Sequence, residues 1–116
     1  MIYTVLLSGL EKETDLWSEN LAPTLEKQLS SQNPQCSDVN RYFVFMTIVE
    51  GSAARVWDID NYYKPIIDSV RKGQLWADDS QIDGMHVVRL RSRTAARTHV
   101  SISIHEAAVQ ACSVGE

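Results

Sequence analysis

Apolar residues gather in four short stretches of the chain that are typical of β-strands. The first, residues 2–7, is composed of β-prone side chains. The second, residues 41–50 (RYFVFMTIVE), is almost continuously apolar, which predicts a central strand buried on both faces. The third and fourth, residues 85–93 and 98–105, alternate apolar and polar side chains, and the short turn between them predicts a hairpin.

Two further segments carry a helical pattern. Residues 11–31 place leucines in a broken apolar stripe, and Pro23 is expected to kink this helix or to start a second one, because proline lacks the amide donor. Residues 61–72 form a shorter helix that tolerates Pro65 near its start. The strands and helices together predict an α+β fold, with one domain over residues 1–116 and a mixed β-sheet against which the helices pack.

Composition excludes several classes of protein. A hydrophobic share of 44% with 22% charged residues is ordinary for a soluble globular protein. No stretch approaches the roughly 18 apolar residues that a membrane span needs, and the N-terminus lacks the basic leader of a secretory signal. Cys36 and Cys112 lack the spacing of metal ligands, so reduced thiols in a cytoplasmic protein are favoured over a disulfide.

The net charge of −4 conceals an uneven distribution along the chain. Residues 1–54 contain seven acidic and three basic residues, whereas residues 55–97 contain six acidic and eight basic residues. The second segment is therefore basic by two charges. This pattern fits a local phosphate-binding face rather than a broadly basic surface for nucleic acid.

The basic segment also contains closely spaced carboxylates. In an extended backbone Asp58 and Asp60 would present both carboxylates on the same face, and Lys64 follows Asp60 by one helical turn. Carboxylates gathered in this way suit a hard cation such as Mg²⁺. By themselves, the two aspartates would also be consistent with a helix cap or a solvated surface. Lys64 would equally be consistent with a surface ion pair to Asp60 or Asp68.

A longer motif extends this pattern. The chain reads WDIDNYYKPIID, then Gly73, then LWADDSQI, which gives D-x-D-N-x-x-K, Asp68 and W-x-D-D-x-Q-[IV] in order. Over roughly residues 56–93 this arrangement resembles the RusA family of Holliday-junction endonucleases. That family consists of small, dimeric, magnesium-dependent resolvases.

The resemblance implies specific roles for individual residues. Asp58, Asp60 and Asp79 correspond to the metal-binding carboxylates of the family, with Mg²⁺ as the expected ion and Mn²⁺ as an alternative, and Lys64 corresponds to its catalytic lysine. The implied reaction is metal-assisted hydrolysis of a DNA phosphodiester. A homodimer is also implied, because symmetric cleavage of two strands of a four-way junction requires two sites.

Other polar residues are candidates for supporting roles. Arg89, Arg91 and Arg93 point to one side of their predicted strand, where they would either grip a DNA backbone or protect an exposed strand edge. The histidines lack ligand spacing, and Trp76 is expected to pack. Six basic residues are candidates for contacts with DNA phosphates: Arg55, Arg71, Lys72, Arg89, Arg91 and Arg93.

The sequence therefore predicts a cytoplasmic, magnesium-dependent endonuclease that resolves Holliday junctions or other branched DNA in recombination and repair. One alternative is a RusA-like module that binds DNA or another protein without catalysis. Another is a nuclease for a different structured substrate.

Overall fold

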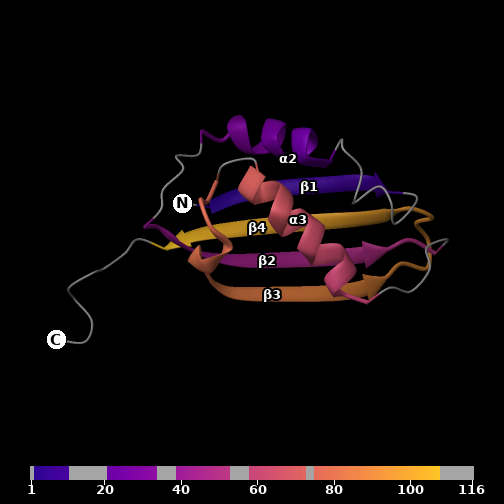
Figure 1. The fold of residues 1–116 in the computed structure, drawn as a ribbon. Coiled ribbons are helices and arrows are strands. Elements are labelled where there is room, and N and C mark those ends of the chain that lie inside the picture. The colour runs from indigo at the N-terminus through magenta and orange to yellow at the C-terminus, as the bar shows by residue number, and fades with distance from the viewer. Residues whose placement is uncertain (1, 11–20, 34–38, 53–57, 73–74, 108–116) are drawn as a thin grey trace.

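A four-stranded mixed β-sheet carries helices on one of its faces (Figure 1). The computed structural model describes residues 2–10, 21–33, 39–52, 58–72 and 75–107. The strands are β1 (Ile2–Leu10), β2 (Arg41–Glu50), β3 (Ile82–Arg91) and β4 (Thr98–Ala107). The helices are α2 (Leu21–Ser30), α3 (Asp60–Lys72) and a short 3-10 helix, η1 (Asp79–Gln81). The α+β fold class predicted from the sequence is confirmed.

Several predicted boundaries agree closely with the observed elements. The strand predicted over residues 41–50 is β2, and the helix predicted over residues 61–72 is α3, which begins one residue earlier. Pro23 lies in the first turn of α2, where a missing amide donor is tolerated. Neither α2 nor α3 combines the length with the apolar composition that a bilayer-spanning helix requires. Residues 11–20, Cys36 and Cys112 lie outside the described residues.

The order of the strands differs from the predicted hairpin. The sheet runs β1-β4-β2-β3, so β3 and β4 lie on opposite sides of β2 and do not pair with each other. β4 is antiparallel to both of its neighbours, whereas β2 and β3 are parallel and are joined through α3. The hairpin prediction was wrong because alternation reveals which side chains share a face but not which strand lies alongside.

Only one face of β2 is buried. Tyr42, Val44 and Ile48 are at most 1% exposed, whereas the intervening Phe43 and Phe45 are 40% and 43% exposed. The prediction that β2 is buried on both faces was therefore wrong. The described helices cover a single face, so the continuous apolar run of β2 supplies a core on one side and leaves aromatic rings on the other.

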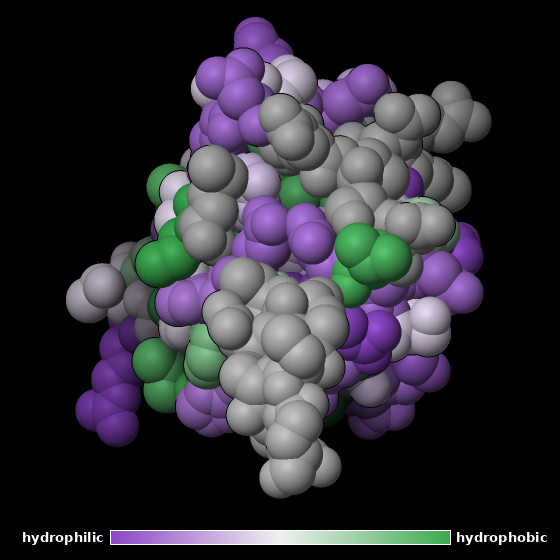
Figure 2. Space-filling model, turned by 90° about the vertical axis from the view of Figure 1, so that its left-hand side faces the viewer, coloured by the Kyte–Doolittle hydropathy of each residue, from purple (hydrophilic) through white to green (hydrophobic). Residues whose placement is uncertain are grey.

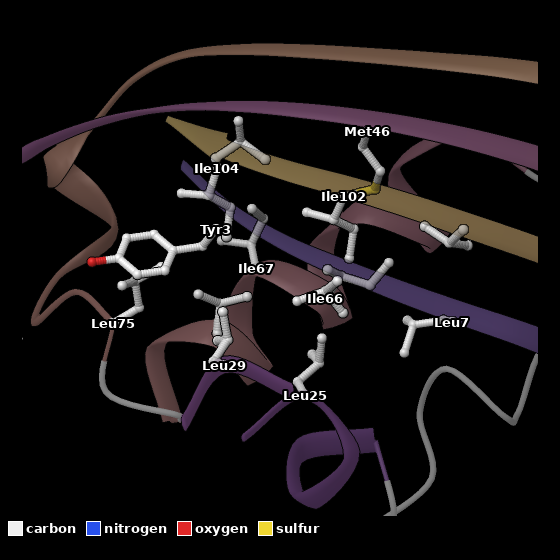
Figure 3. Packing of buried hydrophobic residues seen from close by; sticks show 14 of the residues in the cluster. Tyr3, Leu7, Leu25, Leu29, Met46, Ile66, Ile67, Leu75, Ile102 and Ile104 are labelled. Carbon is white, nitrogen blue, oxygen red and sulfur yellow. The ribbon is translucent and has the colours of Figure 1, made fainter. Parts of the chain in front are cut away.

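The core lies between the sheet and the two helices. Figure 3 shows Leu25 and Leu29 of α2 and Ile66 and Ile67 of α3 directed toward the inner side chains of the strands. Trp76, which follows α3, is fully buried, and its ring lies 5.4 Å from that of Tyr42, so the predicted packing role of this tryptophan is confirmed. This apolar layer fixes α3 across the sheet.

The outer edge of β1 is occupied by side chains of α2 and of the turn that follows it. Gln32 accepts a hydrogen bond from the Thr4 amide (2.9 Å) and donates one to the Thr4 carbonyl (2.7 Å). Gln28 makes the same pair of hydrogen bonds with Leu6, both at 2.9 Å. Each glutamine amide thus stands where a residue of a neighbouring strand would stand, and it satisfies backbone groups that could otherwise recruit another chain.

This arrangement predicts a role for both glutamines in stability and in solubility. Replacement of Gln28 and Gln32 together by alanine should lower the free energy of unfolding by about 1–3 kcal/mol, because four hydrogen bonds to the strand are lost. It should also increase self-association, which analytical ultracentrifugation would detect beside urea unfolding. Lys27→Ala, on the same helix, is the matched control. Unchanged stability and sedimentation in the double variant would contradict the edge-protecting role.

The tyrosine at the start of β1 is tied to the end of β4. The Tyr3 hydroxyl donates a hydrogen bond to Glu106 Oε2 at 3.2 Å, and the Tyr3 ring belongs to the buried core (Figure 3). Burial, followed by the hydrogen bond and the negative charge of Glu106, raises the pKa of Tyr3 to about 12. The folded protein therefore favours the neutral phenol.

A pH dependence of stability follows from this raised pKa. The stabilising contribution is fully present below the ordinary tyrosine pKa of about 10, and it is lost as the pH rises toward about 12. Urea unfolding of wild type should show stability falling by about 2 kcal/mol more between pH 9 and pH 12 than in Tyr3→Phe. Tyr63→Phe is the matched substitution at another partly buried tyrosine. Parallel profiles for wild type and Tyr3→Phe would contradict this assignment.

Candidate functional site

The start of α3 brings together three of the predicted site residues. Asp58 lies two residues before the first residue of the helix, Asp60, and Lys64 Nζ lies 3.2 Å from Asp60 Oδ2. The Asn61 amide donates a hydrogen bond to the Asp58 carbonyl at 3.0 Å, which closes the first turn. The predicted extended D-x-D is therefore wrong, since the helix begins within the motif. The positive end of the helix dipole favours carboxylates at these positions.

Asp79 lies at the opposite end of α3. Because β2 and β3 are parallel, α3 carries the chain back from the end of β2 to the start of β3, as Figure 1 shows. Its 13 residues span about 20 Å at 1.5 Å per residue. The three aspartates therefore do not converge within one chain, contrary to the expectation of a shared site. The side of the molecule that faces the viewer in Figure 2 carries mainly hydrophilic side chains, with several apolar patches, among its described residues.

Asp78 and Asp79 both have local partners at the start of β3. Asp79 Oδ1 accepts a hydrogen bond from Trp76 Nε1 at 3.1 Å, although the aspartate itself is exposed. Asp78 caps η1 by accepting from the Ser80 amide at 3.2 Å, and Gln81 completes the capping box. These contacts define the turn that leads into β3.

The donor set at the start of α3 fits a hard divalent cation. Mg²⁺ is commonly held by one or two carboxylates while waters and substrate phosphate oxygens complete its coordination. Asp58 and Asp60 supply two carboxylates, and the Asp60 side chain is 40% exposed. Within the described residues, no group of three His, Cys, Asp or Glu side chains is arranged to hold a metal ion. Asp58 and Asp60 are thus two carboxylates close together in the chain at an exposed turn, and they are the residues that could contribute to holding a cation.

A buried acidic residue beside this turn was not identified from the sequence. Glu50, at the end of β2, is only 2% exposed. Its Oε2 accepts a hydrogen bond from the Tyr62 hydroxyl at 2.5 Å, and its Oε1 lies 3.5 Å from Arg89 Nε and 3.8 Å from Arg91 Nη1. Burial and the contact with Glu50 raise the pKa of Tyr62. We call these four residues the Glu50 cluster.

The alternation of β2 contained a signal for this cluster. Glu50 continues the even-numbered series that begins with Tyr42 and faces the core. A carboxylate at such a position requires polar or cationic partners, because an isolated buried charge is strongly disfavoured. Arg89, Arg91 and Arg93 were predicted to share one side of their strand; Arg89 and Arg91 do, whereas Arg93 lies beyond the end of β3. Arg89 and Arg91 lie opposite Ile48 and Glu50, on the helix-covered side of the sheet.

The remaining predicted phosphate contacts are dispersed. Arg71 Nη2 pairs with Asp68 Oδ1 at 2.6 Å on the surface of α3. Arg93 is exposed beyond the end of β3. Arg55 and the side chain of Lys72 lie outside the described part of the structure.

The histidines do not form a ligand group. His86 and His105 flank Phe45 on the open face of the sheet, with ring centroids 6.3 Å and 4.8 Å from it. His105 Nε2 is also 2.9 Å from Ser103 Oγ. These contacts place His86 and His105 in packing and hydrogen bonding on that face of the sheet.

Comparison with known protein families adds an independent finding. No curated protein matched the chain. The family model described as endodeoxyribonuclease RusA matches residues 10–103, which include β2, α3, β3 and most of β4. The match covers most of the chain and both segments that carry the predicted aspartates. The protein belongs to the RusA family of endodeoxyribonucleases.

Proposed function

We propose that this protein is a divalent-metal-dependent endonuclease that resolves Holliday junctions or other branched DNA. The observation that carries the proposal is the cluster of Asp58, Asp60 and Lys64 at the exposed start of α3, in a chain of an endodeoxyribonuclease family. Mg²⁺ or Mn²⁺ bound there would polarise a phosphoryl oxygen and lower the pKa of the attacking water.

The side chains at this turn suit the remaining demands of phosphodiester hydrolysis. Asp58 and Asp60 would hold the cation at the helix terminus, and both are accessible to a large substrate. Lys64 is 64% exposed and lies one turn along the helix from its partner Asp60. Its ammonium group is therefore able to turn toward a phosphate and offset the negative charge that develops during cleavage.

Asp79 enters this proposal through a second copy of the chain. It lies about one helix length from the Asp58 and Asp60 pair within a chain, by the helical rise of 1.5 Å per residue. In a homodimer, the Asp79 end of one protomer would meet the Asp58 and Asp60 turn of its partner, and a two-fold axis would generate two equivalent sites. Two sites match the symmetry of a four-way junction.

The separation of Asp79 from the other aspartates also favours a second candidate function. A RusA-like module that binds branched DNA or another protein without cutting would require no assembled triad of carboxylates. Cleavage assays distinguish the two functions, because the module would bind a junction and leave it intact with any divalent metal.

Substitution of the first-turn carboxylate tests the leading proposal. A synthetic four-way junction incubated with wild type and Mg²⁺ should acquire paired nicks, and Asp60→Asn should reduce the cleavage rate by on the order of 100-fold. Asp68→Asn is the matched control, because Asp68 lies on the same helix in a surface pair with Arg71. Circular dichroism should show the same fold in all three proteins. Equal rates in both variants, or intact junctions with Mg²⁺ and Mn²⁺, would contradict the proposal.

Mixing two inactive variants tests whether the site is shared between protomers. Co-expressed Asp60→Asn and Asp79→Asn chains would form heterodimers with one doubly substituted site and one intact site. A shared site should restore roughly a quarter of the wild-type sites in a random mixture, with single rather than paired nicks. If each site belonged to one chain, every site in the mixture would carry a substitution and no activity would return.

A further inference from the structure

Glu50 is an unusual residue to find in the core of this protein. A buried carboxylate loses its hydration, and this loss is offset only where hydrogen bonds and opposite charges surround it. Glu50 receives such partners from two other elements: Tyr62 in the first turn of α3, and the arginine pair of β3. The cluster therefore fastens the end of β2 to both the helix and the edge strand.

The backbone around Glu50 is fixed as well. The Glu50 carbonyl accepts a hydrogen bond from the Ser92 amide at 2.8 Å, and the Gly51 amide donates to Thr98 Oγ1 at 3.0 Å. A Cβ atom at Gly51 would lie 2.1 Å from the carbonyl oxygen of Ala96, so only glycine fits at this position. The carboxylate is thus held from a rigid backbone position.

The two arginines reach the surface from this anchor. β3 is an edge strand, and the side chains of Arg89 and Arg91 remain 31% and 43% exposed while Glu50 is buried. Both guanidinium groups face the same carboxylate oxygen, which places them side by side at the rim of the sheet. A planar guanidinium with several N–H donors is well suited to phosphate oxygens.

This rim adjoins the proposed catalytic turn. Tyr62, which contacts Glu50, is two residues beyond Asp60 in α3. Two arginine pairs of the described structure lie elsewhere, and each involves an acid that is more exposed than Glu50. Arg41 pairs with Asp83 near the start of β3, and Arg71 pairs with Asp68 toward the end of α3.

We propose that Glu50, supported by Tyr62, is a positioning residue that holds Arg89 and Arg91 as a clamp for a DNA backbone phosphate beside Asp58 and Asp60. This inference rests on the proposed function, because it names the part of the site that grips the substrate. The buried carboxylate acts through the arginines and does not touch DNA.

The direction in which one substitution changes DNA affinity distinguishes this role from simple charge repulsion. Removal of an acid near DNA should by itself strengthen binding, because phosphate repulsion decreases. Glu50→Gln should instead weaken binding of a four-way junction about five- to tenfold, because the two guanidiniums lose the charge that holds them together. Fluorescence anisotropy in EDTA, at several salt concentrations, measures binding without cleavage.

A matched control is available near the start of β3, the strand that carries Arg89 and Arg91 near its end. The Arg41 guanidinium, chiefly through its hydrogen bond, holds the pKa of Asp83 below its usual range, so Asp83 is charged at neutral pH. Asp83→Asn also removes an acid paired with arginine, and it should leave junction binding unchanged or slightly tighter. Tyr62→Phe, which removes one support of Glu50, should weaken binding less than Glu50→Gln does.

Variants of the two arginines provide a second test, which remains informative if Glu50→Gln lowers the stability of the protein. Arg89→Gln and Arg91→Gln should each reduce the slope of log affinity against log salt by about 1, as expected for the loss of one phosphate contact. In the doubly substituted arginine background, Glu50→Gln should no longer weaken binding. Equal weakening in both backgrounds, or tightening that matches Asp83→Asn, would overturn the proposal.

The same measurements distinguish failure of the clamp from failure of the proposed function. Salt-dependent binding that requires both arginines and Glu50, without cleavage by wild type, would support the clamp and refute the nuclease. Cleavage by wild type with Glu50→Gln indistinguishable from Asp83→Asn in binding would support the nuclease and refute the clamp. Absence of junction binding by wild type would refute both.

Discussion

The parallel pairing of β2 and β3 constrains the rest of this structure. Two parallel strands cannot be joined by a tight turn, so the chain must travel the length of the sheet between them. α3 forms this crossover connection, and its apolar side packs on the inner face of the sheet. The crossover therefore determines at once where the core lies and which end of the helix each polar motif occupies.

Because helices cover only one face of the sheet, both the apolar core and the buried charged residues lie on that face. The inner positions of β1, β2 and β4 are apolar almost throughout, whereas the series in β2 ends in Glu50 and the series in β3 ends in arginines. The polar residues meet where the apolar layer ends, at the rim beside the first turn of α3. A buried carboxylate at that boundary links strand, helix and edge strand in a way that hydrophobic contacts, which lack direction, cannot. The proposed catalytic turn is thus attached to a rigid support.

The RusA family motif is divided between two places in one chain. The two halves of the motif, Asp58 to Lys64 and Trp76 to Gln81, are separated by the length of α3. In one chain, the first half offers a two-carboxylate turn and the second half builds a capped turn around Trp76. A shared site in a homodimer would reunite them, and the arginine pair of β3 would then face the substrate beside the first half.

Several features of the fold were determined by local sequence alone. The apolar run of β2 set its bounds, the pattern after Asp60 set those of α3, and the alternation of β3 set Arg89 and Arg91 on one side, because these features depend on side-chain periodicity and backbone propensity. Other features were decided only by tertiary structure. The insertion of β4 between β1 and β2, the exposure of Phe43 and Phe45, the separation of Asp79 from Asp60, and the partners that surround Glu50 all depend on which elements become neighbours. Periodicity reports the face of a residue, whereas its partner across that face is selected by the packing of the whole chain.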